Sequence, residues 1–176
     1  MFIDRLAKKM PANVTVVADV GQNQIWTCTE YKFRKEGRLL TSGGMGTMGY
    51  SVPAAIGAKM ADNSRATVAI CGDGAFQMSF MELATAVQFG VDIKVVVMTN
   101  NRLGMVRELQ TNGYHDRQTA VFLDGSPDFI KLAEAYGIPA MRVYDDDTME
   151  KGVEMLAEHK GICLVEVVVD KDMPTL

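Results

Sequence analysis

The stretch TVAICGDG, residues 67–74, is the part of the sequence that decides the fold. Its first five residues form a short apolar and β-branched run, a pattern typical of a strand buried on both faces of a parallel sheet. The run stops at Gly72, Asp73 and Gly74, where glycines permit a tight turn and an aspartate offers a hard oxygen ligand. Because ligands bind beyond the carboxyl ends of parallel strands, this stop is a candidate site.

Similar strand-like runs recur along the chain, and segments with helical spacing separate them. The predicted strands are residues 14–18, 93–99, 163–169, a weaker run at 141–144 and a short extended piece at 39–40. The predicted helices are residues 53–60, 80–89 with Leu83, Ala84, Val87 and Gln88 on one face, a helix that begins at Pro127 after an N-cap at Ser126, and 148–159 with Gly161 as its stop. This alternation predicts an α/β fold, a doubly wound and mainly parallel sheet with helices on both faces.

Composition narrows the class of protein. The chain has 176 residues, 48% hydrophobic and 23% charged, which is the profile of a globular protein, and we expect residues 1–176 to form a single domain. Eighteen basic and twenty-two acidic residues give a net charge of −4, so neither nucleic acid nor a membrane surface is an expected partner. Cys28, Cys71 and Cys163 are too scattered for a disulfide framework or a metal site. Together with the lack of an apolar leader sequence, these cysteines favour a cytoplasmic protein. Cys71 and Cys163 lie in apolar runs, and we expect them in the core.

A second candidate site is the glycine-rich stretch TSGGMGTMGY, residues 41–50. Gly44, Gly46 and Gly49 within it match the GxGxxG pattern of dinucleotide-binding turns. Alone, the pattern is equally consistent with a tightly packed turn that binds nothing.

The third candidate, Asn100 and Asn101, ends the predicted strand that follows Asp73 along the chain. Asp73 and Asn100 are then expected at neighbouring positions on one edge of the sheet. Mg²⁺ prefers a few protein oxygen ligands and takes the others from phosphate and water, so this pair predicts a magnesium–diphosphate site. An Asp-Gly turn in which Asp73 only caps the next helix is the alternative interpretation.

These motifs resemble those of thiamine diphosphate enzymes, whose diphosphate-binding signature is similar to Gly72-Asp73-Gly74 followed by Asn100-Asn101. More narrowly, residues 19–26, 41–50 with 53–58, and 104–106 resemble the C-terminal domain of acetolactate (acetohydroxyacid) synthase catalytic subunits. The resemblance runs from about residue 14 to residue 169. It implies a thiamine diphosphate- and Mg²⁺-dependent enzyme of branched-chain amino-acid biosynthesis, which decarboxylates pyruvate and transfers the hydroxyethyl unit to a second 2-oxo acid.

The resemblance also implies roles for individual residues. Mg²⁺ would be bound by the Asp73 and Asn100 side chains and the Arg102 main-chain carbonyl. Gln22 and Asn23, with the amides near Gly74 and Ala75, would hold the diphosphate. In the same family the Gly46 carbonyl would accept a hydrogen bond from the aminopyrimidine, and Met48 would wedge beneath the cofactor and bend it. Positions matching further cofactor-binding residues are Thr47, Leu103, Gly104 and Met105, with Met105 and Leu109 on the substrate side.

Two departures from the family pattern matter. A tryptophan is usual at the position of Leu109, so the choice of acceptor 2-oxo acid is open. Thiamine enzymes also use an activating glutamate on a pyrimidine-binding domain, and Glu82 and Glu108 both lie inside the diphosphate-domain pattern. We therefore expect this domain from the rest of a longer chain or a partner subunit, a homo-oligomer such as a dimer, and no turnover by this chain alone; FAD would belong only to a longer parent chain.

Other functions remain open at this stage. The chain could be the diphosphate-binding subunit of a split thiamine enzyme, such as a sulfopyruvate-type decarboxylase or a 2-oxo acid oxidoreductase. An NAD-dependent oxidoreductase would use Gly44, Gly46 and Gly49 as the dinucleotide turn and Asp73 as the ribose ligand, but that interpretation gives Asn100 no role. A non-catalytic interaction module would have no reason to retain both Asp73 and Asn100. Met48 and Met105 could also be core residues.

Overall fold

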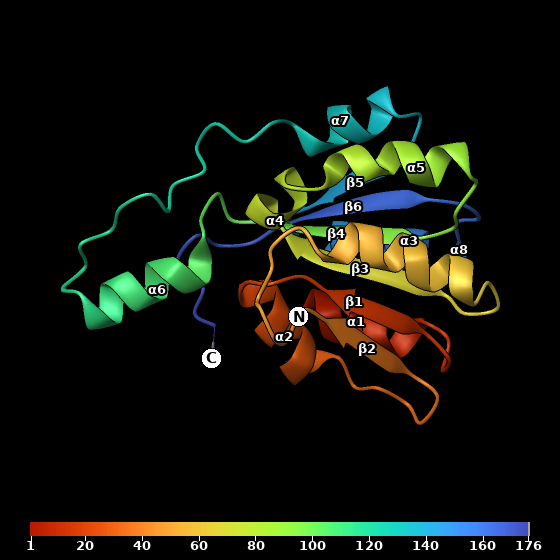
Figure 1. Cartoon of the computed structure of the whole chain (residues 1–176), viewed down its shortest axis with the longest axis horizontal. Coiled ribbons are helices and arrows are strands. Elements are labelled where there is room, and N and C mark those ends of the chain that lie inside the picture. Colours follow the sequence, from red (N-terminus) through yellow and green to blue (C-terminus); the bar gives the residue numbers. More distant parts are fainter. Residues whose placement is uncertain (176) are drawn as a thin grey trace.

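A single six-stranded sheet forms the centre of the molecule (Figure 1). The computed structural model describes residues 1–175. The strand order is β2-β1-β3-β4-β6-β5, and every neighbouring pair is parallel, which confirms the predicted α/β fold. The strands are β1 (Thr15–Ala18), β2 (Arg38–Thr41), β3 (Thr67–Gly72), β4 (Lys94–Thr99), β5 (Ala140–Val143) and β6 (Cys163–Val168).

Helices cover both faces of this sheet. On one face lie α1 (Phe2–Lys9), α2 (Gln22–Glu30) and α8 (Asp146–Glu158), and on the other α3 (Ser51–Ala61), α4 (Asp73–Gln77), η1 (Phe80–Glu82), α5 (Leu83–Gln88) and α7 (Phe129–Ala135). The central strands are therefore buried on both sides. In β4, Val96 packs on the face covered by α1, α2 and α8, whereas Val95 and Val97 pack on the opposite face. Cys71 and Cys163 are buried in these two cores, as expected.

Helix α6 (Gly104–Gly113) is the exception to this layering. It extends away from the sheet, and the loop that follows it returns to α7 over a long path (Figure 1). Its exposed side chains include Met105, Val106 and Leu109. Because α6 begins at the carboxyl edge of the sheet, it lies beside any ligand that binds at this edge.

Two local predictions were wrong. The N-cap of α7 is Asp128, whose carboxylate accepts hydrogen bonds from the main-chain N–H groups of Ile130 and Lys131, because its side chain reaches these amides while the Ser126 hydroxyl donates to the Leu123 carbonyl. In residues 80–89 the chain first makes a 3₁₀ turn, which changes the helical phase. Leu83 and Ala86 consequently face the core, whereas the expected Ala84, Val87 and Gln88 are exposed.

Helix boundaries also shifted, and some helices were not foreseen. Helix α8 begins at Asp146, two residues before the predicted start, since Asp145 and Thr148 form a capping box. Helices α1, α2 and α6 were not predicted, although α1 carries Phe2, Ile3, Leu6 and Ala7 at helical spacing and buries all four. Within residues 1–175, no helix has both the length and the apolar character needed to cross a membrane.

Candidate functional site

The topology creates a crevice between the carboxyl ends of β1 and β3. The chain leaves β1 toward β2 on one side and continues from β3 toward β4 on the other, so the two turns diverge and leave an opening between them. A cavity of about 200 Å³ lies there. Eleven of the site residues suggested by the sequence line it: Gln22, Asn23, Met48, Asp73, Gly74, Ala75, Asn100, Arg102, Leu103, Gly104 and Met105.

Asp73 lies at the end of β3, 2% exposed, and is held by main-chain amides. One carboxylate oxygen accepts from the N–H of Asn101 at 2.6 Å and of Asn100 at 3.2 Å, and the other accepts from Gly74 N–H at 2.8 Å. Burial raises the pKa of this carboxyl above its usual value, although the amide hydrogen bonds oppose the shift. A cation next to Asp73 would offset this cost of burying its charge.

Asn100 stands beside Asp73 because β3 and β4 are adjacent and parallel. Its side-chain N–H donates to Gln22 Oε1 at 3.0 Å, and its Oδ1 accepts from the main-chain N–H of Arg102 at 3.0 Å. Asn101 adopts a φ of 55°, which turns the chain sharply after β4. The carboxylate of Asp73 and the amide of Asn100 thus lie at one edge of the cavity.

Arg102 is anchored on the outer side of this turn. Its guanidinium donates to the Asn101 carbonyl at 2.7 Å and to Asp124 at 2.9 Å, and it lies 4.7 Å from the centre of the Phe122 ring. Its main chain also forms an antiparallel bridge with Phe122. These contacts direct the charged side chain away from Asp73, so any contribution of Arg102 to a metal site would come from its main chain.

Gln22 and Asn23 open α2, which follows β1, and both are almost fully buried. The Asn23 side-chain N–H groups donate to the carbonyls of Asp19 and Ile70, which ties the ends of β1 and β3 together. Gln22 donates to the Met173 carbonyl at 2.9 Å and to the Thr175 hydroxyl at 3.1 Å. With both side chains so engaged, the main-chain N–H groups at the start of α2 are the better anion donors, because a helix leaves its first amides without intrahelical partners.

Two glycines permit the close contacts that shape the cavity. A Cβ at Gly104 would lie 1.8 Å from Gln22 Oε1, so a larger residue there would displace the Gln22 side chain. A Cβ at Gly74 would lie 2.7 Å from Leu103 Cδ2 and 3.4 Å from Met48 Cε. Met48 therefore reaches across the cavity to the turn after β3.

Three of the predicted site residues do not line the cavity: Gly46, Thr47 and Leu109. Gly46 and Thr47 are exposed in the glycine-rich loop, where Gly46 has a φ of 64° and both main-chain amides donate to Ser42. Leu109 is 60% exposed, one turn beyond Met105 on α6. The first two lie at the open edge of the site, and Leu109 faces outward.

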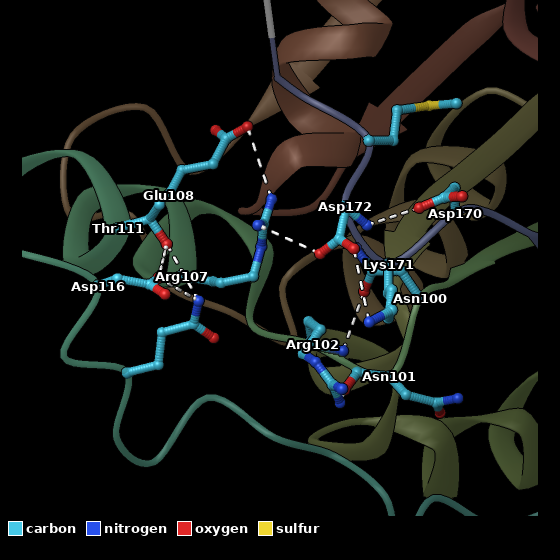
Figure 2. A network of polar contacts seen from close by, with 12 residues as sticks. Asn100, Asn101, Arg102, Arg107, Glu108, Thr111, Asp116, Asp170, Lys171 and Asp172 are labelled. Atoms are coloured by element: carbon cyan, nitrogen blue, oxygen red, sulfur yellow. Dashed lines mark hydrogen bonds and ion pairs between the residues drawn. The ribbon is translucent and has the colours of Figure 1, made fainter.

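The segment of residues 170–175 adds contacts that the sequence did not predict. Glu108 accepts from Gln22 at 3.3 Å and from Thr175 N–H at 2.7 Å, and Trp26 Nε1 donates to the Pro174 carbonyl at 3.2 Å. Figure 2 shows Arg107 between Glu108 and Asp172, at 4.0 and 3.6 Å. This segment joins α2 to α6, and since it has neither periodicity nor a motif, nothing in the sequence could have revealed it.

Comparison with known proteins identifies the family to which this chain is similar. Residues 19–167 match a family model described as "Thiamine pyrophosphate enzyme, C-terminal TPP binding domain". The chain is 42% identical over 161 residues to the mitochondrial acetolactate synthase catalytic subunit of Aspergillus candidus, which covers 92% of this chain and 23% of that protein. It is 42% identical to the acetolactate synthase large subunit of Lactococcus lactis (89% and 27%) and 34% identical to the acetolactate synthase isozyme 2 large subunit of Escherichia coli (97% and 31%). The chain thus spans about a quarter of the length of these curated relatives.

Proposed function

Because the chain belongs to the thiamine pyrophosphate enzymes, as their C-terminal TPP binding domain, we propose that it forms the diphosphate-binding half of an acetolactate synthase active site. The complete enzyme would decarboxylate pyruvate and join the two-carbon product to a second 2-oxo acid, a step of branched-chain amino-acid biosynthesis. The relatives named acetolactate synthase support this reaction over that of a split decarboxylase or oxidoreductase.

The observation that carries the proposal is the pairing of Asp73 with Asn100 at one edge of the cavity. A buried carboxylate and an amide oxygen are hard ligands, and they come from the ends of adjacent strands. The amides of Asn100 and Asn101 hold the carboxylate in one orientation. This donor set fits Mg²⁺, with the Arg102 carbonyl as the third protein ligand and phosphate and water completing the shell.

The rest of the cavity fits the organic part of the cofactor. Diphosphate would lie at the start of α2 and near Gly74, where main-chain amides and small residues allow a close approach. Met48, Met98 and Met105 line the same cavity and supply apolar walls. Bound thiamine diphosphate would supply an electron sink for the carbanion formed when carbon dioxide leaves the substrate; the protein residues would hold its diphosphate, support its rings and exclude water.

The activating glutamate must then come from outside this half-site. Glu108 already accepts hydrogen bonds from Gln22 and Thr175, and Glu82 accepts one from Thr85. The exposed Met105, Val106 and Leu109 of α6 are a surface that a pyrimidine-binding domain could cover. We therefore propose that the domain is supplied by a longer chain or by a partner in a homodimer, and that the 176-residue chain alone does not turn over.

A fluorescence titration tests the function. Trp26 is the only tryptophan and lines the cavity, so its emission reports occupancy of the site. Thiamine diphosphate should change this emission only when Mg²⁺ is present, and NAD should not change it. Saturable binding of NAD without a metal requirement, or no response to thiamine diphosphate with Mg²⁺, would contradict the proposal.

A further inference from the structure

Asp19 is a buried carboxylate that the proposed function leaves without a role. It follows the last residue of β1 and is 0% exposed. One of its oxygens accepts from Gly49 N–H at 3.0 Å and from Val20 N–H at 2.9 Å, and the other accepts from Ser51 N–H at 2.8 Å. Two of these donors belong to the exit of the glycine-rich loop, so Asp19 joins β1 to a segment thirty residues further along the chain.

The contact to Ser51 stabilises the start of α3. Helix α3 begins at Ser51, and its own N-cap residue, Tyr50, makes no side-chain cap hydrogen bond. Asp19 therefore acts as a cap from outside the helix, where a negative charge is favourable. Burial of a carboxylate is costly unless it is hydrogen-bonded, and the three amides satisfy it.

The contact to Gly49 fixes the residue next to Met48. Gly49 has a φ of 83°, and a Cβ at this position would lie 3.0 Å from Met78 Cβ. The preceding part of the loop, residues 43–47, is exposed. The position of the Met48 main chain is thus set from its C-terminal side, by the bond from Gly49 to Asp19.

Met48 in turn reaches the turn that would receive the diphosphate, since its methyl group lies 3.4 Å from the place of a Cβ on Gly74. We propose that Asp19 is a positioning residue. By holding Gly49 and Ser51, it sets how far the Met48 side chain extends into the cavity toward the cofactor. The positioning of Met48 against a cofactor rests on the proposed function. The anchoring of Gly49 and Ser51 by Asp19 does not depend on it.

The carboxyl side chain of Asp19 matters because both of its oxygens accept hydrogen bonds. In Asp19→Asn one oxygen becomes an NH₂ group, which would face the N–H of Gly49 or Ser51 donor to donor. Asp19→Glu keeps two acceptors on a longer side chain, and Asp19→Ala removes both. Asp62→Asn is the matched control, because Asp62 sits at the other end of α3 and accepts from Ser64 at the surface.

The test measures amide hydrogen exchange by NMR and the half-saturating concentration of thiamine diphosphate with Mg²⁺, both on the 176-residue chain. In Asp19→Asn we expect exchange of Gly49 and Ser51 to rise about tenfold or more, since hydrogen bonds to a charged acceptor are strong, while exchange in β6 stays unchanged. The half-saturating concentration should rise about tenfold in Asp19→Asn, less in Asp19→Glu, and not at all in Asp62→Asn.

Unchanged exchange at Gly49 and Ser51 would overturn the anchoring role. Faster exchange with an unchanged half-saturating concentration would overturn the positioning role. If the unmutated chain does not bind thiamine diphosphate, the proposed function fails and the positioning role with it, whereas the exchange rates still decide the anchoring. If Asp19→Ala does not fold, Asp19→Asn and Asp19→Glu supply the same readouts.

Discussion

The main-chain N–H of Asn101 donates to the carboxylate of Asp73 at 2.6 Å, across the ends of two adjacent strands. The contact exists because β3 and β4 pair in parallel, with Gly72 opposite Met98, so the turns that follow them begin at the same edge of the sheet. Within residues 1–175, the hydrogen bonds that this buried carboxylate accepts all come from main-chain amides. Asp73 is the centre of the proposed metal site.

Asp73→Asn should abolish Mg²⁺-dependent cofactor binding without unfolding the chain. Burial raises the pKa of Asp73, so the neutral amide relieves a desolvation cost, but its NH₂ group would face a main-chain N–H that the carboxylate now accepts. The apo variant should therefore stay folded and melt about 2–8 °C below the unmutated chain. Thermal melts with and without Mg²⁺ and thiamine diphosphate measure both effects. Asp124→Asn, which alters the exposed partner of Arg102, is the control and should keep the ligand-induced shift. An undiminished shift in Asp73→Asn would refute the metal assignment.

Gly104→Ala should weaken both the fold and the cofactor site. The new Cβ would displace the Gln22 side chain, which would lose its hydrogen bonds to Asn100 and to residues 173–175. Overpacking of this kind costs about 1–3 kcal/mol of unfolding free energy, measurable by urea denaturation. Gly113→Ala, at the other end of α6, has its nearest contact at 3.9 Å and should be neutral or stabilising by up to about 1 kcal/mol. Equal stability of the two variants would argue against the close approach of α6 to α2.

Arg142→Met should destabilise the fold away from the cofactor site. Arg142 pairs with Glu166, which is 4% exposed, at 2.8 Å, and removing the cation leaves a buried carboxylate without its partner. Because Arg142 is partly exposed, we expect a loss of about 2 kcal/mol, below the full cost of breaking a buried pair. The double variant Arg142→Met with Glu166→Met should recover part of this loss. A double variant less stable than Arg142→Met alone would contradict this view of the pair.

The three thiols should differ sharply in reactivity. Burial raises the pKa of Cys163 to about 11 and raises the pKa of Cys71 well above the usual value of a thiol, whereas Cys28 is exposed. The thiolate is the reactive form, so at pH 8 only about one in a thousand Cys163 thiols is ionised. Alkylation of the native chain, followed by mass spectrometry, should therefore modify Cys28 alone, and all three in denaturant. Modification of Cys163 at a rate similar to Cys28 in the native chain would show that its strand is not buried as described.

Much of the fold could be predicted from local patterns. The apolar runs that became β1, β3, β4 and β6 are continuous because both faces of each strand are covered, and they were placed within about one residue. Helix details were less predictable. Ser126 and Asp128 both have cap-forming side chains, and only the path of the chain into α7 decides which one reaches the free amides.

The candidate site divides in the same way. Asp73 and Asn100 stood out in the sequence because each directly follows a strand, and parallel pairing brings strand ends together. Gln22 received a role only through the resemblance to thiamine diphosphate enzymes, and its contacts to Glu108 and Thr175 depend on how α6 and residues 170–175 cross in space.

By itself, then, the sequence determined the strand runs, their polar stops and the class of chemistry those stops suit, since these follow from residues close together in the chain. The tertiary structure alone decided that Asp19 holds Gly49 and Ser51 and that Gly104 lies against Gln22. Such contacts join distant segments, and their existence depends on the packing of whole elements, which no local pattern encodes.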